Sequence, residues 1–149
     1  MTTHKSDAVT AGIMPDFTQA GVVLCRYTEF TSADDSIVSG DTLQLIPIPK
    51  YARVIKTTLY HDAMPGGTTD CDIGFKGNAD AFYAGTTYKT AVWKFSPDLS
   101  FEYVGFSHIF TADDTIDLTF GSMATKLPTS VKINLAVEYV MTGTISDES

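Results

Sequence analysis

The stretch Gly40–Ala84, GDTLQLIPIPKYARVIKTTLYHDAMPGGTTDCDIGFKGNADAFYA, decides the expected fold because it contains three strand patterns separated by turn signals. Thr42–Ile48 follows a Gly-Asp pair, Ala52–Asp62 is rich in strand-forming residues, and Asp70–Phe75 alternates apolar with polar positions. One candidate inner face of the second pattern consists of Ile55, Thr57 and Leu59. The stretch therefore predicts a β structure rather than a helical one.

Prolines and glycines set the expected ends of these strands. Pro47 and Pro49 cannot donate to a ladder of hydrogen bonds, so the first strand should end there or lie at a sheet edge. After the third strand, the sequence Gly-Asn-Ala-Asp predicts a short segment that packs as one helical turn. Its inward residues would be Ala81, Phe82 and Ala84.

The remaining chain adds strand patterns on both sides of this stretch: Ala20–Thr31, Thr86–Phe95, Phe101–Thr111, Thr115–Phe120 and Val131–Met141. The last has the clearest alternation of apolar and polar residues in the chain. About eight strands at short spacing, with no sustained helical period, indicate an all-β fold. We expect an antiparallel β-sandwich, with a jelly roll as the leading architecture.

Residues 1–17 show neither a strand period nor a helix period, and we expect an extended N-terminal arm before a β-sandwich domain spanning residues 18–149. Apolar residues next to a proline give the arm a means of docking on another surface. These candidate partner-binding residues are Ile13, Met14, Pro15 and Phe17. A free terminus is the alternative interpretation.

Composition narrows the function. The 149 residues carry a formal charge of −8, and the sequence pI is near 4.6. Binding to nucleic-acid phosphates requires a basic surface, so we expect no nucleic-acid partner. No stretch approaches the roughly 20 apolar residues needed to span a bilayer, and the N-terminus lacks the apolar core of a secretory signal. We expect synthesis in the cytoplasm and no membrane partner.

Candidate catalytic and metal-binding residues are sparse. His4, His61 and His108 do not follow metal-ligand spacing, and no nucleophile motif or nucleotide-binding loop is present. Cys25 and Cys71 do not form a C-x-x-C pair, so they read as buried small residues, with a disulfide as the alternative. We expect a protein that is not an enzyme and has no cofactor.

Acidic side chains gather in the C-terminal half, where the segment from Lys94 to Lys126 contains no other Lys or Arg. Asp113 and Asp114 lie at a predicted turn in this segment. Three interpretations stay open for them: turn-forming side chains on a solvated face, oxygen ligands for Ca²⁺, or part of a patch that meets a basic partner surface.

Six pieces of sequence occur in an order that has a parallel in known proteins: Gly40–Pro49, Gly66–Thr69, Asp72–Gly74, Asn78–Phe82, Ala112–Leu118 and Val137–Tyr139. As an ordered set, they resemble the capsid decoration (cement) proteins of tailed phages. An aliphatic residue would be usual at the position of Cys71, which departs from that pattern.

This resemblance implies a jelly-roll or β-tulip module that forms a homotrimer on the outer capsid surface of the virion. It implies binding to the major capsid protein, which reinforces the head, and an N-terminal arm that clamps neighbouring subunits. The alternative is a carbohydrate-binding β-sandwich module of a phage head fibre or tail. In that case Trp93, with Tyr88 and Phe95 nearby, could form a sugar-stacking platform, although core packing is the favoured explanation of these residues.

Overall fold

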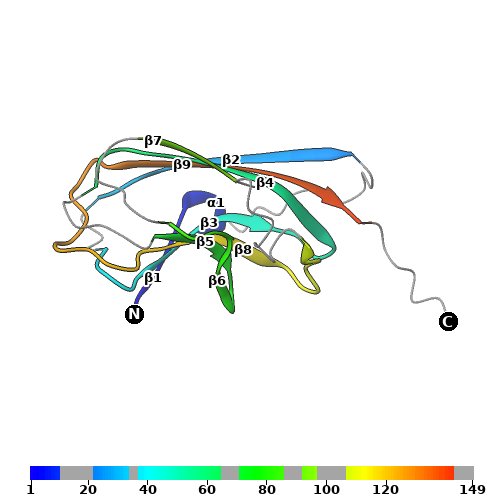
Figure 1. Ribbon diagram of the computed structural model, residues 1–149, viewed down its shortest axis with the longest axis horizontal. Helices are drawn as coiled ribbons and strands as arrows, with labels where there is room; N and C mark the ends of the chain where they lie inside the picture. Colours follow the sequence, from blue (N-terminus) through cyan, green and yellow to red (C-terminus); the bar gives the residue numbers. More distant parts are fainter. Residues whose placement is uncertain (11–21, 34–36, 65–70, 86–91, 97–106, 143–149) are drawn as a thin grey trace.

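The computed structural model describes residues 1–10, 22–33, 37–64, 71–85, 92–96 and 107–142. Within this part of the chain, the strands are β1 (Thr3–Lys5), β2 (Val23–Thr31), β3 (Thr42–Ile48), β4 (Ala52–His61), β5 (Asp72–Phe75), β6 (Asn78–Tyr83), β7 (Val92–Ser96), β8 (Asp114–Thr119) and β9 (Lys132–Met141). A four-residue helix, α1 (Asp7–Thr10), follows β1. The strands form two sheets that face each other as two layers (Figure 1).

The order of the strands defines a jelly roll. One layer has the order β2-β9-β4-β7, and the other has β3-β8-β5-β6, with β1 added at the outer edge of β3. From β2 to β9, each step along the chain changes sheet, except the hairpin that joins β5 to β6. The predicted all-β sandwich is therefore confirmed. The expectation of purely antiparallel strands is corrected at one pair, because β1 pairs with β3 in parallel.

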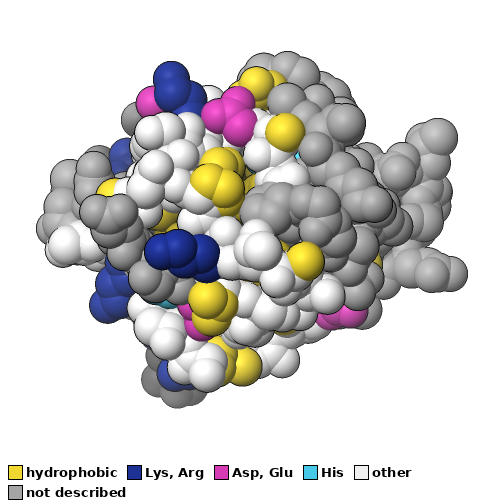
Figure 2. Space-filling view, turned by 90° about the vertical axis from the view of Figure 1, so that its left-hand side faces the viewer, with side chains coloured by type: hydrophobic (Ala, Val, Ile, Leu, Met, Phe, Trp, Pro, Cys, Tyr) yellow, Lys and Arg dark blue, Asp and Glu magenta, His cyan; other side chains and the backbone are white. Residues whose placement is uncertain are grey.

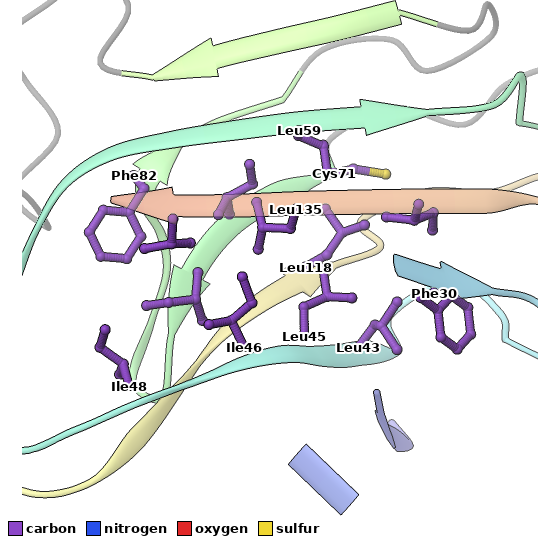
Figure 3. Close-up of a cluster of buried hydrophobic side chains, with 14 of the residues drawn as sticks. Phe30, Leu43, Leu45, Ile46, Ile48, Leu59, Cys71, Phe82, Leu118 and Leu135 are labelled. Carbon is purple, nitrogen blue, oxygen red and sulfur yellow. The ribbon is translucent and has the colours of Figure 1, made fainter. Parts of the chain in front are cut away.

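The core lies between the two layers. Along β9 and the residue before it, every second side chain from Val131 to Met141 is buried, as the alternation predicts. Figure 3 shows side chains from both sheets that meet in this space, among them Leu59 and Leu135 from one sheet and Leu43, Leu45 and Leu118 from the other. Each fully buried leucine stabilises the fold by about 1.5–3 kcal/mol relative to an exposed one.

Bulges in two strands shift the alternation that the sequence suggests. In β4, the register with β9 shifts between Val54 and Lys56, so that Ile55 leaves the inner face and is only half-buried. The expected face of Ile55, Thr57 and Leu59 is therefore wrong at its first member. In β3, a similar shift between Gln44 and Ile46 allows neighbouring residues to be buried together.

The helical turn expected after Gly77 is also wrong, because Asn78–Tyr83 forms strand β6 in a hairpin with β5. Gly77 has a φ of 87°, which suits the tight turn. A Cβ atom on Gly74 would lie 2.1 Å from the backbone oxygen of Asn78, so the start of β6 folds closely over β5. This close approach is possible because residue 74 is a glycine.

The first ten residues, which belong to the expected extended arm, are attached to the edge of the sandwich. His4 lies on β1, and its Nε2 is 3.0 Å from Oδ2 of Asp41. Oδ1 of the same carboxylate accepts a hydrogen bond from the Thr2 backbone at 2.8 Å. The Ser6 side chain donates to the Leu45 carbonyl. Residues 11–17, including Ile13, Met14, Pro15 and Phe17, lie outside the described residues.

Two further expectations are corrected in part. Within the predicted strand Phe101–Thr111, the described residues 107–111 form no strand, although Phe110 exchanges backbone hydrogen bonds with Tyr51 and Ala52. Cys71 is buried as predicted, whereas Cys25 is exposed, and the two do not form a disulfide.

Candidate partner-binding groove

Two adjoining hollows lie on the outer face of the β1-β3-β8-β5-β6 sheet. The larger, of about 540 Å³, lies between β1 and the β5–β6 hairpin, and Thr42, Gln44 and Asp117 are among its lining residues. The smaller, of about 370 Å³, continues toward the turn before β8. Gln44 and Lys76 line both hollows. We call the two hollows together the outer groove.

Strand β8 places a carboxylate in the outer groove. Its neighbours Ile116 and Leu118 point into the core and are fully buried, so Asp117 points to the opposite face. In the sheet, Asp117 lies in register with Gln44 on β3 and with Gly74 on β5. Gly74 contributes no side chain, and the start of β6 covers this side of the sheet.

Asp117 is therefore enclosed on what would otherwise be a solvent-facing side. Its exposed fraction is only 6%, and no hydrogen-bond partner for its Oδ1 is found among the described residues. Burial raises the pKa of Asp117 to about 7; the nearby Thr115 side chain acts to lower it, and the negative charge of Asp114 raises it further. A carboxyl with this pKa changes its charge near neutral pH.

Acidic and basic side chains share the smaller hollow. Asp113 and Asp114, which the sequence singled out, both line it, together with Lys5 and Lys76. Oδ1 of Asp113 accepts a hydrogen bond from the Lys50 backbone at 2.9 Å, and Oδ1 of Asp114 accepts one from the Thr115 backbone at 2.8 Å. The turn-forming interpretation of the two acids is supported by these bonds, and both acids also border the groove.

The histidines occupy three unrelated settings. His4 pairs with Asp41 near β1. His61 is buried at the end of β4, with its Nδ1 2.8 Å from the Asp62 carbonyl oxygen. The ring of His108 stacks on Phe75, with the ring centroids 4.4 Å apart. In the described ranges, no three His, Cys, Asp or Glu residues come together as a metal-binding group.

The described side chains do not include those that the sugar-stacking alternative requires. Trp93 and Phe95 lie on β7, where Trp93 is paired with Tyr60 and Phe95 with Thr58. Their side chains, and the whole of Tyr88, lie outside what the structure describes. The role of these aromatic residues stays a prediction.

Sequence reasoning missed Asp117 as a site residue. In the pattern TIDLTF of Thr115–Phe120, it occupies an ordinary polar position between two apolar ones. Nothing in that pattern shows that β1 and the β5–β6 hairpin enclose this position. The presence of Gly74 two residues before a turn is the nearest signal, because a glycine in a strand can mark a close backbone approach.

The described part of the chain contains no helix with the length and apolar character required to cross a membrane. At the end of the sandwich shown in Figure 2, apolar side chains on the described residues occur in small groups separated by polar and charged ones. Large apolar residues that are exposed include Val22, Val23 and Tyr27 at β2.

Comparison with known proteins gives a likeness of fold. No protein-family model matches the chain, and no curated protein matches it. Among solved structures, a chain of the capsid of Ralstonia phage GP4 superimposes with a TM-score of 0.76 and 19% sequence identity, covering 95% of this chain and 99% of that one. A chain of the cyanophage Pam1 capsid asymmetric unit gives a TM-score of 0.52 and 16% identity, covering 85% and 90%. The jelly roll is thus a fold that also occurs in two phage capsids.

Proposed function

We propose that this chain is a phage capsid decoration protein, which binds the outer surface of the shell formed by the major capsid protein and stabilises the head. The observation that carries this proposal is the likeness over nearly the full length of both chains to a chain of the Ralstonia phage GP4 capsid. The likeness to the cyanophage Pam1 capsid chain and the ordered sequence pieces described above point the same way.

A structural role agrees with the physical properties of the chain. A decoration protein requires many modest contacts over a wide surface, and a closed symmetric assembly multiplies the effect of each contact. We propose a homotrimer that contacts the shell through the outer groove and through Ile13, Met14, Pro15 and Phe17. The net charge of −8 favours partners with basic surfaces. The proposed role involves no catalysis.

The experiment that tests this proposal is cryo-electron microscopy of the phage particle that encodes the chain, together with quantitative mass spectrometry of purified virions. We expect density for the jelly roll on the outside of the shell and a fixed ratio to the major capsid protein. A chain absent from purified virions would contradict the proposal. Density only at the tail or at a head fibre would favour the carbohydrate-binding alternative.

The apolar residues of the N-terminal segment provide a second test. Replacing Ile13, Met14 and Phe17 together by serine should lower the occupancy of the shell while the domain still folds. A matched variant, Val38→Ser, replaces an exposed apolar residue elsewhere in the chain and should leave occupancy unchanged. Equal occupancy for both variants would show that Ile13, Met14 and Phe17 do not contribute to the contact with the shell.

A further inference from the structure

We propose that the outer groove receives a Lys or Arg side chain from an extended segment of the shell protein, with the Asp117 carboxylate as its partner. This inference rests on the proposed function for the identity of the partner protein. It goes beyond that function because it assigns a particular groove, a particular anchoring residue and the chemical class of the inserted group.

The first support is the state of Asp117 in the isolated chain. The side chain is more than nine-tenths buried, lines the larger hollow, and its Oδ1 has no hydrogen-bond partner in the described ranges. A buried carboxylate oxygen without a hydrogen-bond partner is costly, whereas a charge-assisted hydrogen bond to a cation offsets much of that cost. A guanidinium or ammonium group entering the hollow would supply the missing donor.

The second support is the surroundings of the groove. Asp113 and Asp114 share the smaller hollow with Lys5 and Lys76, while the chain as a whole is acidic. Together with the amino group of Met1, these two lysines balance the charges of Asp113, Asp114 and ionised Asp117. This balance favours a segment with one inserted basic side chain over a densely basic one.

A sugar is a poorer match to the same groove. Phe75 is the aromatic residue lining the larger hollow, but its ring already stacks on His108 and contacts the edge of Phe110, with centroids 4.4 and 5.2 Å apart. A ring engaged in this way offers less of its face to a sugar. A basic side chain is therefore the better match to this groove, and a glycan array tests the sugar.

Binding of a cation in this groove should release a proton. Near pH 6 most Asp117 carboxyls are neutral, and near pH 8 most are ionised, because burial raises the pKa of this group to about 7. The ionised fraction rises from about one tenth to about nine tenths over this range, so affinity should rise about tenfold. The charged or titratable groups that line the two hollows together with Asp117 are Asp113, Asp114, Lys5, Lys76 and the amino group of Met1, and of these Asp114 acts directly on the pKa of Asp117.

The test measures binding of the full chain to shells from a phage that lacks it, by co-sedimentation at pH 6, 7 and 8. We compare the unmodified chain with Asp117→Asn and with Glu29→Gln, which removes one exposed acid from β2 in the other sheet. Asp117→Asn should bind at least about tenfold more weakly at pH 8 and should lose the rise in affinity between pH 6 and 8. Glu29→Gln should retain both.

The outcomes separate this inference from the proposed function. If Asp117→Asn binds shells with the affinity and pH profile of the unmodified chain, the groove is not the anchor although the decoration role stands. If the unmodified chain binds no shells, both the decoration role and the assigned partner are wrong. A glycan array in which binding is lost in Asp117→Asn would overturn the basic side chain as occupant in favour of a sugar.

Discussion

Strands β8 and β9 are the two most regular strands of the sequence, yet their outer faces differ. Each occupies an inner position of its own sheet and sends every second side chain into the shared core. On β9 the outward residues, such as Glu138, are partly exposed, and Glu138 lies 4.0 Å from Lys56. On β8 the outward Asp117 is almost as buried as its apolar neighbours.

The difference teaches that alternation fixes which side of the sheet a residue faces, but not whether that side meets water. The outer side of β9 is open near Glu138, whereas β1 and the β5–β6 hairpin rise beside Asp117. The segments beside Asp117 are distant from it in sequence. An outward polar residue is therefore an ordinary surface residue on β9 and an enclosed carboxyl on β8. Four predictions would break or sharpen this comparison.

Shortening a buried side chain on the inner face of either strand should lower the free energy of unfolding by a similar amount, and this is the largest effect we expect. Leu135→Ala on β9 and Leu118→Ala on β8 each remove a fully buried side chain and should each lower the free energy of unfolding by about 3–5 kcal/mol. Urea denaturation followed by tryptophan fluorescence measures this loss. Glu138→Ala on the outer face should cost about 0.5 kcal/mol or less, because an exposed ion pair contributes little. A cost for Leu118→Ala as small as this would show that β8 does not border the core.

The cover over β8 should depend on Gly74. The added side chain in Gly74→Val would overlap the backbone of Asn78 and Ala79, so we expect a loss of about 3 kcal/mol or more in the free energy of unfolding. Gly77→Ala is the matched control, because space is available there and only the φ of 87° is strained, at about 1 kcal/mol. Equal losses for the two variants would contradict the close packing of the hairpin over β5.

Removing the outward acid of β8 should raise the free energy of unfolding, whereas removing the outward acid Glu138 of β9 should lower it slightly. The pKa of Asp117 in the folded chain is raised from 3.8 to about 7, so the folded state is progressively destabilised as pH rises through this interval. Asp117→Asn should therefore raise the free energy of unfolding by roughly 2–3 kcal/mol at pH 8 and change it little at pH 4. Asp80→Asn, at an exposed acid on β6, should show no such pH dependence. A destabilised Asp117→Asn protein at pH 8 would mean that the carboxylate has a partner in the folded chain.

The smallest effect should come from the attachment of β1. Burial acts to raise the pKa of Asp41, but hydrogen bonds from the Val38 and Thr2 backbone and from His4 lower it on balance. Asp41→Ala should cost about 1–2 kcal/mol at pH 7, and this contribution should disappear as pH falls below about 4. Hydrogen exchange should show faster opening of β1, with Ser39→Ala as a control at a nearby exposed hydroxyl. Unchanged exchange would mean that other contacts hold β1.

Much of the fold could be predicted from local pattern. Thr42–Ile48 forms β3 with the predicted bounds, and the alternation of Val131–Met141 matches the buried face of β9. The predicted inner face of β4 was wrong at Ile55, because the bulge depends on pairing with β9. Pairing with β5 likewise decided that Asn78–Tyr83 is a strand and not a helical turn.

The candidate site was predictable only in part. Asp113 and Asp114 were identified from their position in an acidic segment, and both line the outer groove. Asp117 was not identified, because nothing near it in sequence encloses it. The proposed roles of Ile13, Met14, Pro15 and Phe17 stay predictions.

The sequence by itself determined the β class, most strand positions, the acidic character and the inward face of the two regular strands. These follow from side-chain alternation and turn chemistry, which act between residues close together in the chain. Only the tertiary structure decided the jelly-roll order, the bulges, the strand β1 and the enclosure of Asp117. Each of these depends on contacts between segments distant in sequence, such as the register of Asp117 with Gln44 and Gly74. Local pattern carries no information about which distant segment will lie over a given face.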